Sequence, residues 1–160
     1  MKTIWIIFLI ICSIRAEAQD SLQFARLKSL QNKTGTFAEF AKKDSLFLIC
    51  FWSVNSEESI TELNSINANL ESWQSMRPFR FMAISVDEAK NANRMRPTYN
   101  MNGWTFDSYS DLYGDIRRTL HSNNLPQSMI VYKNQIVYEQ TGWAPGSENY
   151  LIQRIVSFKH

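Results

Sequence analysis

The apolar residues of this chain follow two patterns, continuous runs and runs with helical spacing. Residues 45–51 and 79–86 are nearly continuous apolar segments bounded by polar residues. Short runs of this kind are typical of strands buried on both faces of an α/β sheet. Between them, one apolar stripe recurs at intervals of three and four residues: Ile60, Leu63, Ile66, Leu70 and Trp73. The pattern therefore predicts a buried strand, an amphipathic helix and a second buried strand.

The start of the predicted helix carries the signals of a helix N-terminus. Asn55 or Ser56 can cap it, because short polar side chains accept hydrogen bonds from the free N–H groups of the first turn. Glu57 and Glu58 follow, where the helix dipole favours negative charge. The helix is therefore expected to start at about these residues.

The remaining elements complete an α/β pattern. Residues 22–40 predict a small hairpin and a helical turn through Phe40, and Lys133-Asn134 joins 129–132 to 135–139 as a second hairpin. A short extended piece is expected at 104–106. Three further helices are expected: one opened by Asp87 and Glu88 and running towards Tyr99, one over 111–120, and a last one with Tyr150, Leu151, Ile155 and Phe158 on its inner face. This order predicts parallel strands joined by crossovers, with an antiparallel pair at one side.

The N-terminus has the form of a secretory signal peptide. Lys2 precedes an apolar run over 4–13, and Ala16-Glu17-Ala18 fits the small-x-small cleavage rule. The run is shorter than the roughly 20 residues that a spanning helix needs. A lipid anchor on Cys12 is a rival, but the bulky Ile11 precedes that cysteine; an uncleaved anchor is another. We expect residues 1–18 to be removed and 19–160 to form a single domain, exported to the periplasm or secreted.

The net charge and the cysteine content narrow the range of expected partners and cofactors. Loss of the leader takes the formal net charge from +2 to +1, which gives no electrostatic reason to expect nucleic acid or an anionic membrane as a partner. The processed chain keeps one cysteine, Cys50, in an apolar run that favours a buried residue over a reactive thiol. One cysteine and two separated histidines give no metal-ligand spacing, so we expect neither a metal nor a cofactor.

Residues 51–63 (FWSVNSEESITEL) carry a family resemblance. They resemble the exported TlpA/ResA-type branch of the thioredoxin-like superfamily, in which a strand ends in Phe-Trp-Ala-x-Trp-Cys-x-x-Cys before an acidic-Leu pair. Phe51, Trp52, Glu62 and Leu63 match, and Ser56 and Ser59 stand at the two cysteine positions. Four more segments are similar to family motifs in the same order: 84–87, 103–106, 124–127 (with Asn124 in place of a glycine) and 142–146. The resemblance implies a thioredoxin-like fold, with a central mixed sheet flanked by helices on both faces and an N-terminal hairpin extension.

The resemblance also implies what the two serines change. In the family, the helix start stabilises a thiolate that attacks a disulfide, and the second cysteine resolves the intermediate. Serine hydroxyls at 56 and 59 cannot do this, so the redox site is degenerate and no catalytic residue is expected. Pro126 matches a proline that is cis in the family and lies against this helix start, where the preceding backbone pairs with a bound peptide. The implied peptide-binding groove contains Trp52, Val54, Asn55, Leu125 and Pro126, with Trp104 beside them.

These inferences leave several functions open. The leading hypothesis is a non-catalytic binding or scaffolding protein of the cell envelope with a protein or peptide partner. One alternative is a thioredoxin-family oxidoreductase or antioxidant protein acting through Cys50 or an external thiol. Another is a purely structural domain within a larger envelope assembly. A hydrolytic Ser56 would need a general base such as His121, and a helix-capping role explains Ser56 more simply.

Overall fold

The computed structural model describes residues 23–41, 45–88, 90–119, 124–133 and 135–159. They form one seven-stranded sheet in the order β2-β1-β5-β4-β3-β6-β7. Its strands are β1 (Arg26–Ser29), β2 (Thr34–Thr36), β3 (Leu46–Trp52), β4 (Arg80–Ser85), β5 (Asp107–Asp111), β6 (Gln127–Tyr132) and β7 (Gln135–Thr141). The helices are α2 (Phe37–Phe40), α3 (Glu57–Met76), α4 (Met95–Met101), α5 (Asp115–Thr119) and α6 (Glu148–Ser157), with a 3₁₀ turn at Ala92–Arg94.

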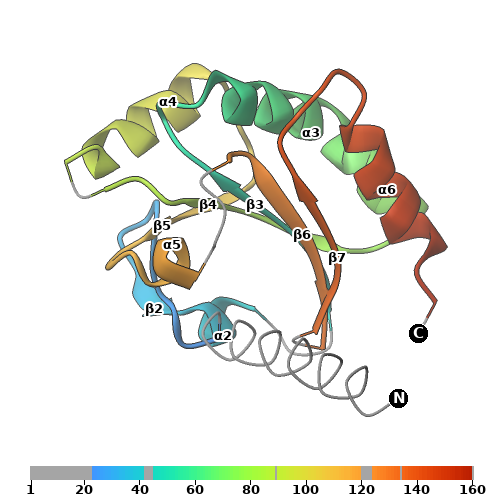
Figure 1. Ribbon diagram of the computed structural model, residues 1–160, viewed down its shortest axis with the longest axis horizontal. Helices are drawn as coiled ribbons and strands as arrows, with labels where there is room; N and C mark the ends of the chain where they lie inside the picture. The colour runs from blue at the N-terminus through green and yellow to red at the C-terminus, as the bar shows by residue number, and fades with distance from the viewer. Residues whose placement is uncertain (1–22, 42–44, 89, 120–123, 134, 160) are drawn as a thin grey trace, which may run out of the picture.

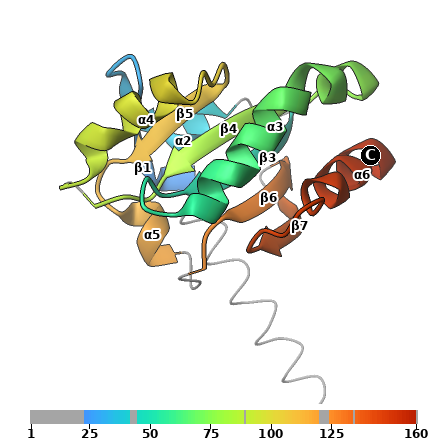
Figure 2. The same cartoon turned by 90° about the horizontal axis from the view of Figure 1, so that it is seen from above.

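Parallel and antiparallel pairs combine in this sheet, as predicted. β3, β4 and β5 run parallel, while β1–β2, β1–β5, β3–β6 and β6–β7 are antiparallel pairs. The helices α3, α4 and α6 cover one face, and α2 and α5 cover the other (Figures 1 and 2). The expected fold class is therefore confirmed: a mixed sheet with helices on both faces and a hairpin, β1–β2, at its N-terminal side.

Successive side chains of β3 point to opposite faces of the sheet, and helices cover both faces, which explains why the strand is apolar throughout. Every residue of β3 is buried. Leu46, Leu48, Cys50 and Trp52 face the core beneath α3, whereas Phe47, Ile49 and Phe51 face the core on the α2 side. A central strand with helices on both sides has no solvent-facing residue, so its hydrophobic pattern does not alternate. This arrangement places Cys50 under α3.

Several local predictions need correction. Asp87 and Glu88 do not open a helix; helical structure begins with the turn at Ala92, because the Asp87 carboxylate is bound at the end of β4. Residues 104–106 are not a strand, since β5 begins one residue later and the Trp104 and Phe106 rings pack into the core instead.

Two predicted helices also differ from the observed ones. The helix expected over 111–120 starts at Asp115, because Asp111 is the last residue of β5. In α6, Leu151 and Ile155 are buried as expected, but Tyr150 is 60% exposed and does not belong to the inner face. Phe158 follows the helix and packs against the edge of the core.

The first 22 residues lie outside the described residues, so the predicted leader, its cleavage site and Cys12 are not part of this description. Within the described ranges, no helix combines the length and hydrophobicity needed to cross a bilayer.

Candidate binding site at the start of helix α3

Ser56 and Ser59 meet in the first turn of α3. Ser56 is the N-cap residue, and its hydroxyl oxygen accepts a hydrogen bond from the Ser59 backbone N–H at 3.2 Å. The Ser59 hydroxyl donates to the same oxygen at 2.8 Å. Ser59 is fully buried and Ser56 half-buried. The two serines therefore form a polar pair that caps the helix, with Ser56 on its outer side.

A carboxylate just beyond the end of β4 holds the turn that leads into α3. Asp87 accepts hydrogen bonds from the Ser53 hydroxyl at 2.7 Å and from the Val54 backbone N–H at 3.0 Å. The Ser85 hydroxyl donates to it at 2.7 Å. Asp87 thus fixes the position of the serine pair, a role that sequence reasoning missed when it placed this residue in a helix. The available signal was a polar residue directly after a buried strand.

A groove lies between this turn and the loop that precedes β6. The peptide bond between Leu125 and Pro126 is cis, and the Gly142 backbone N–H donates to the Pro126 carbonyl at 2.8 Å. The cavity has a volume of about 520 Å³. Its lining comes from the α3 start, the Pro126 loop and the end of β7: Ser53, Asn55, Ser56, Glu58, Asn124, Leu125, Thr141 and Gly142. The fold therefore brings Asn55, Ser56 and Leu125 into the lining of one groove.

Trp52, Val54 and Pro126 were all expected in the groove, but none of them belongs to its lining, and all three are buried. Trp52 is completely buried and Val54 is 6% exposed. The Trp52 ring makes an edge-to-face contact with Trp104 at 5.1 Å, and the Trp104 indole N–H donates to the Asn64 side chain at 2.7 Å. Both tryptophans belong to the core beneath α3. Thr141 and Gly142 take their place on the surface, brought there by the β6–β7 hairpin.

The charges around the groove are mixed. Glu57 and Glu58 are exposed in the first turn of α3, and Glu58 reaches the groove lining. On the other side, Arg94 donates to the Asn55 side-chain oxygen at 2.8 Å. Carboxylates and a guanidinium therefore border the same surface, which suits a polar partner with both donors and acceptors.

Hydrolysis and metal binding are the alternatives to a helix-capping role for the polar residues at this site. His121 and His160 lie outside the described residues, so the Ser56–His121 pair, which the sequence disfavours, is not tested here. Among the described side chains, no three His, Cys, Asp or Glu groups come together in a way that could hold a metal ion.

Comparison with known proteins identifies solved structures that share this fold. No protein-family model and no curated protein matches the chain. A solved thioredoxin-like protein from Porphyromonas gingivalis shares 29% sequence identity, with a TM-score of 0.74 over 88% of this chain and 94% of that one. The chain has a thioredoxin-like fold.

Two further solved structures share the fold at lower identity. StoA from Bacillus subtilis is 15% identical, with a TM-score of 0.65 over 80% of this chain and 92% of that one. A secreted Mycobacterium tuberculosis disulfide oxidoreductase, homologous to E. coli DsbE, is also 15% identical, with a TM-score of 0.67 over 87% and 98% of the two chains. At this level of identity the two structures show a shared fold.

The chain buries a polar cluster between β3, β6 and α3. The Cys50 thiol donates to the Glu62 carboxylate at 3.1 Å, and the Ser128 hydroxyl donates to the same oxygen, Oε2, at 3.2 Å. Cys50 and Ser128 are cross-strand neighbours on β3 and β6, while Glu62 reaches down from α3. All three are at most 1% exposed, and the other Glu62 oxygen has no hydrogen-bond partner.

Burial controls the ionisation of this cluster. Desolvation raises the pKa of the Glu62 carboxyl, and the hydrogen bonds from Cys50 and Ser128 offset part of that shift. Desolvation and the nearby Glu62 charge raise the pKa of the Cys50 thiol well above its ordinary value. Cys50 is therefore held as a neutral thiol in the interior, the opposite of the exposed, low-pKa thiolate that disulfide exchange requires.

Proposed function

We propose that this thioredoxin-like protein is an exported, non-catalytic binding protein that holds an extended peptide segment in the groove beside Leu125 and Pro126. The observation that carries the proposal is the Ser56–Ser59 pair, which caps α3 at the edge of this groove. In the family that the sequence resembles, two cysteines occupy the same place in the motif. We therefore propose that the chain retains the peptide-binding groove of that family but does not carry out disulfide exchange.

The loss of the covalent step follows from the chemistry of the serine hydroxyl. Disulfide exchange needs a thiolate that attacks one sulfur and releases another. A serine hydroxyl forms no stable bond to sulfur, and the Ser59 proton is already donated to Ser56. Cys50 cannot act in its place, because it is completely buried and its thiol pKa is raised. These observations argue against the alternative of an oxidoreductase that acts through Cys50.

An extended peptide is the proposed partner because the groove presents backbone as well as side chains. Asn124 and Leu125 reach the groove just before Pro126, and Gly142 closes it on the other side. In the resembled family this stretch pairs with a peptide as an added strand, so main-chain hydrogen bonds supply affinity and side-chain pockets supply selectivity. The half-buried Leu125 offers the apolar contact, and Asn55 offers a polar one.

Export is supported by the secretory pattern of residues 1–18 and by the secreted state of the mycobacterial oxidoreductase that shares this fold. Outside the cytosol, in an oxidising compartment, the groove would be exposed to unfolded or extended segments of other proteins. The proposed site of action is therefore the periplasm or the exterior of the cell.

A peptide-binding assay tests the proposal. Peptides selected from a random displayed library on the purified secreted protein would be labelled, and their dissociation constants measured by fluorescence polarisation. Leu125→Asp places a charge in the groove and should weaken binding at least tenfold. Met101→Asp is the matched control, because Met101 is 82% exposed and does not line the groove. Equal affinity of both variants, or failure to select any peptide, would rule out this groove as the binding site.

A further inference from the structure

The groove beside Leu125 and Pro126 has a single charged side chain in its described lining. Glu58, the second residue of α3, contributes to that lining, and the other described lining residues are uncharged. Leu125 supplies an apolar contact, and most of the rest are small polar residues. A peptide bound in this groove therefore passes beside one negative charge.

The Glu58 carboxylate is available to a ligand. Its residue is exposed, and among the described side chains no lysine or arginine lies within ion-pair distance of it. Glu88, by contrast, pairs with both Lys90 and Arg117 at 3.1 Å. Because the charge of Glu58 is not matched by a described cation of the chain, a cation supplied by a partner can match it.

Arg94 borders the groove but does not belong to its lining. Its guanidinium donates to the side-chain oxygen of Asn55 at 2.8 Å, and Arg94 is not among the residues that line the cavity. The guanidinium is therefore engaged with Asn55, and the charge that a ligand meets inside the groove is the negative charge of Glu58.

Ser56 places a hydrogen-bond donor next to Glu58. Its hydroxyl oxygen accepts hydrogen bonds from the backbone N–H and from the hydroxyl of Ser59. A hydroxyl has two lone pairs and one proton, so the proton is what Ser56 still has to offer. A main-chain carbonyl of a bound peptide is a suitable acceptor, and this bond would bring the neighbouring peptide side chains towards Glu58.

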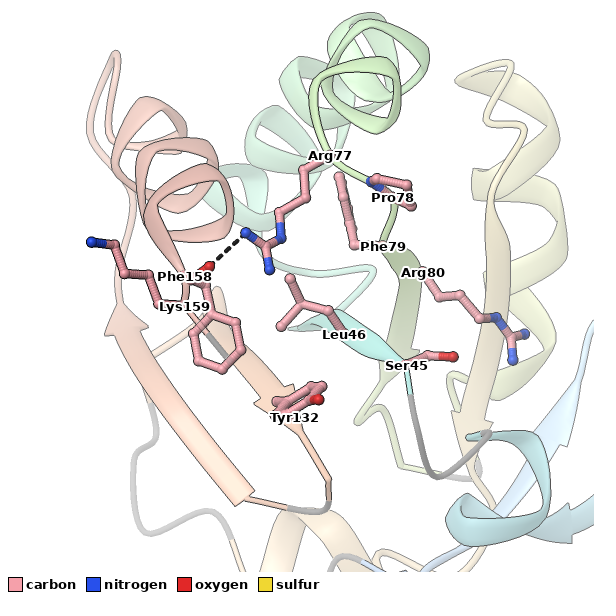
Figure 3. A pocket seen from close by; sticks show the side chains of 9 residues that line it. All are labelled: Ser45, Leu46, Arg77, Pro78, Phe79, Arg80, Tyr132, Phe158 and Lys159. Carbon is pink, nitrogen blue, oxygen red and sulfur yellow. Dashed lines mark hydrogen bonds between the residues drawn. The ribbon is translucent and has the colours of Figure 1, made fainter.

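A second cavity has the opposite charge. It has a volume of about 920 Å³ and lies at the C-terminal end of α3, beside the first residues of β3 and β4 and the segment after α6 (Figure 3). Its charged lining residues are Arg77, Arg80 and Lys159, and none of the described residues that line it is acidic. Arg77 is bound there to the Phe158 carbonyl at 2.5 Å. A cationic ligand is therefore disfavoured at this cavity, which serves as an internal control.

We propose that the groove selects extended peptides that carry a basic residue, with arginine preferred to lysine. This inference rests on the proposed function and names its class of partner. The peptide guanidinium donates to the Glu58 carboxylate, because the two planar groups match as bidentate partners. A backbone carbonyl of the peptide accepts from the Ser56 hydroxyl, and Leu125 contacts an apolar side chain of the same peptide. Since Glu58 is exposed, the gain in affinity is about three- to fivefold.

A matched peptide series tests the charge preference. The secreted protein, labelled with ¹⁵N, would be titrated with the acetylated and amidated peptide Ser-Thr-Val-Xaa-Val-Thr-Ser, in which Xaa is arginine, its neutral isostere citrulline, or glutamate. The arginine peptide should shift amides at 53–58, 124–125 and 141–142 and leave those of Arg77 and Arg80 unchanged. It should bind about three- to fivefold more tightly than the citrulline peptide, with the glutamate peptide weakest. In about 1 M salt this difference should disappear, because the Debye length falls to about 3 Å.

Charge variants assign the preference to Glu58. Glu58→Gln should remove the advantage of the arginine peptide, and Glu58→Lys should make the glutamate peptide bind more tightly than the arginine peptide. If a lysine at this helix start prevents folding, Glu58→Gln alone decides. Glu71→Lys is the matched control, because Glu71 is an exposed glutamate of the same helix, about 20 Å further along at about 1.5 Å per residue. It should leave the order of the three peptides unchanged.

The outcomes distinguish this inference from the proposed function. Equal affinities of the arginine and citrulline peptides, with shifts in the groove, would retain the groove as a peptide site and refute its preference for basic residues. An arginine preference that persists in Glu58→Gln would also refute the inference, because another residue would then contact the cation. If none of the three peptides shifts the groove amides, both the inference and the proposed function are wrong.

Discussion

Replacement of both Ser56 and Ser59 by cysteine is expected to create a disulfide at the start of α3. The two hydroxyl oxygens are already 2.8 Å apart, and the N-cap backbone of Ser56 is extended rather than helical. The side chains therefore converge from residues three apart, a spacing compatible with disulfide geometry. Carbon–sulfur bonds are longer than carbon–oxygen bonds, so two sulfurs placed here can reach bonding distance with little backbone movement.

The expected gain in stability follows from the size of the closed loop. A loop of four residues gives about 2 kcal/mol in the chain-entropy description, before any strain is subtracted. Overpacking is limited, because each substitution exchanges only oxygen for sulfur, although Ser59 is fully buried. We therefore expect the oxidised double variant to be more stable than its reduced form by up to about 2 kcal/mol.

The helix start should also make the new thiols reactive. A cysteine at a helix N-terminus has a thiol pKa below its ordinary value of about 8.5, because the dipole and free N–H groups stabilise the thiolate. Glu57 and Glu58 oppose part of this effect. The expected outcome is slow but measurable exchange with glutathione disulfide, which the wild-type chain lacks.

Thiol titration, intact mass and denaturant unfolding measure these effects with and without dithiothreitol. The chain offers a matched control in Ser72 and Ser75, which have the same spacing near the other end of α3 and are both exposed. Cysteines at 72 and 75 lie on regular helical backbone near a helix C-terminus, where a thiolate is disfavoured. If the 56/59 pair stays reduced in an oxidising buffer, or behaves no differently from the 72/75 pair, the two serines do not occupy a site equivalent to the family's cysteines.

Three further outcomes are expected. Stability should fall as pH rises from the unfolded pKa of glutamate, about 4.3, through the raised folded pKa of Glu62, because the native state then binds more protons than the unfolded state. In urea unfolding, Glu62→Gln should reduce the fall of the unfolding free energy with pH. Asp111→Asn should reduce what remains of it, because burial raises the pKa of Asp111 as well. An unchanged pH dependence in both variants would refute the assignment. The wild-type protein should not reduce insulin with dithiothreitol above background, and activity abolished by Cys50→Ala would contradict this. Mass spectrometry of the exported protein should find Gln19 as the first residue, whereas a lipidated Cys12 would place the protein on a membrane.

Part of the site could be predicted from the sequence because it depends on local order. Ser56 caps α3 because a short polar side chain precedes two glutamates and an apolar stripe, and helix capping is decided within one turn. The burial of Cys50 follows from an apolar run too continuous for a strand with one solvent face. The β6–β7 hairpin likewise follows from two β-rich runs around a tight polar turn.

Tertiary packing decided what those local patterns left open. Asp87 looked like a helix start, but strand pairing brings it to Ser53 and Val54, and three hydrogen bonds outweigh its helical preference. Trp52 looked like a groove residue, and the pleat of β3 turns it into the core instead. The Cys50–Glu62–Ser128 cluster unites residues from distant elements. The spacing of apolar residues in the sequence indicates whether a segment is a helix or a strand. Which side chains from different elements come into contact, in the core or around a charged group, is decided only when the elements pack on the sheet.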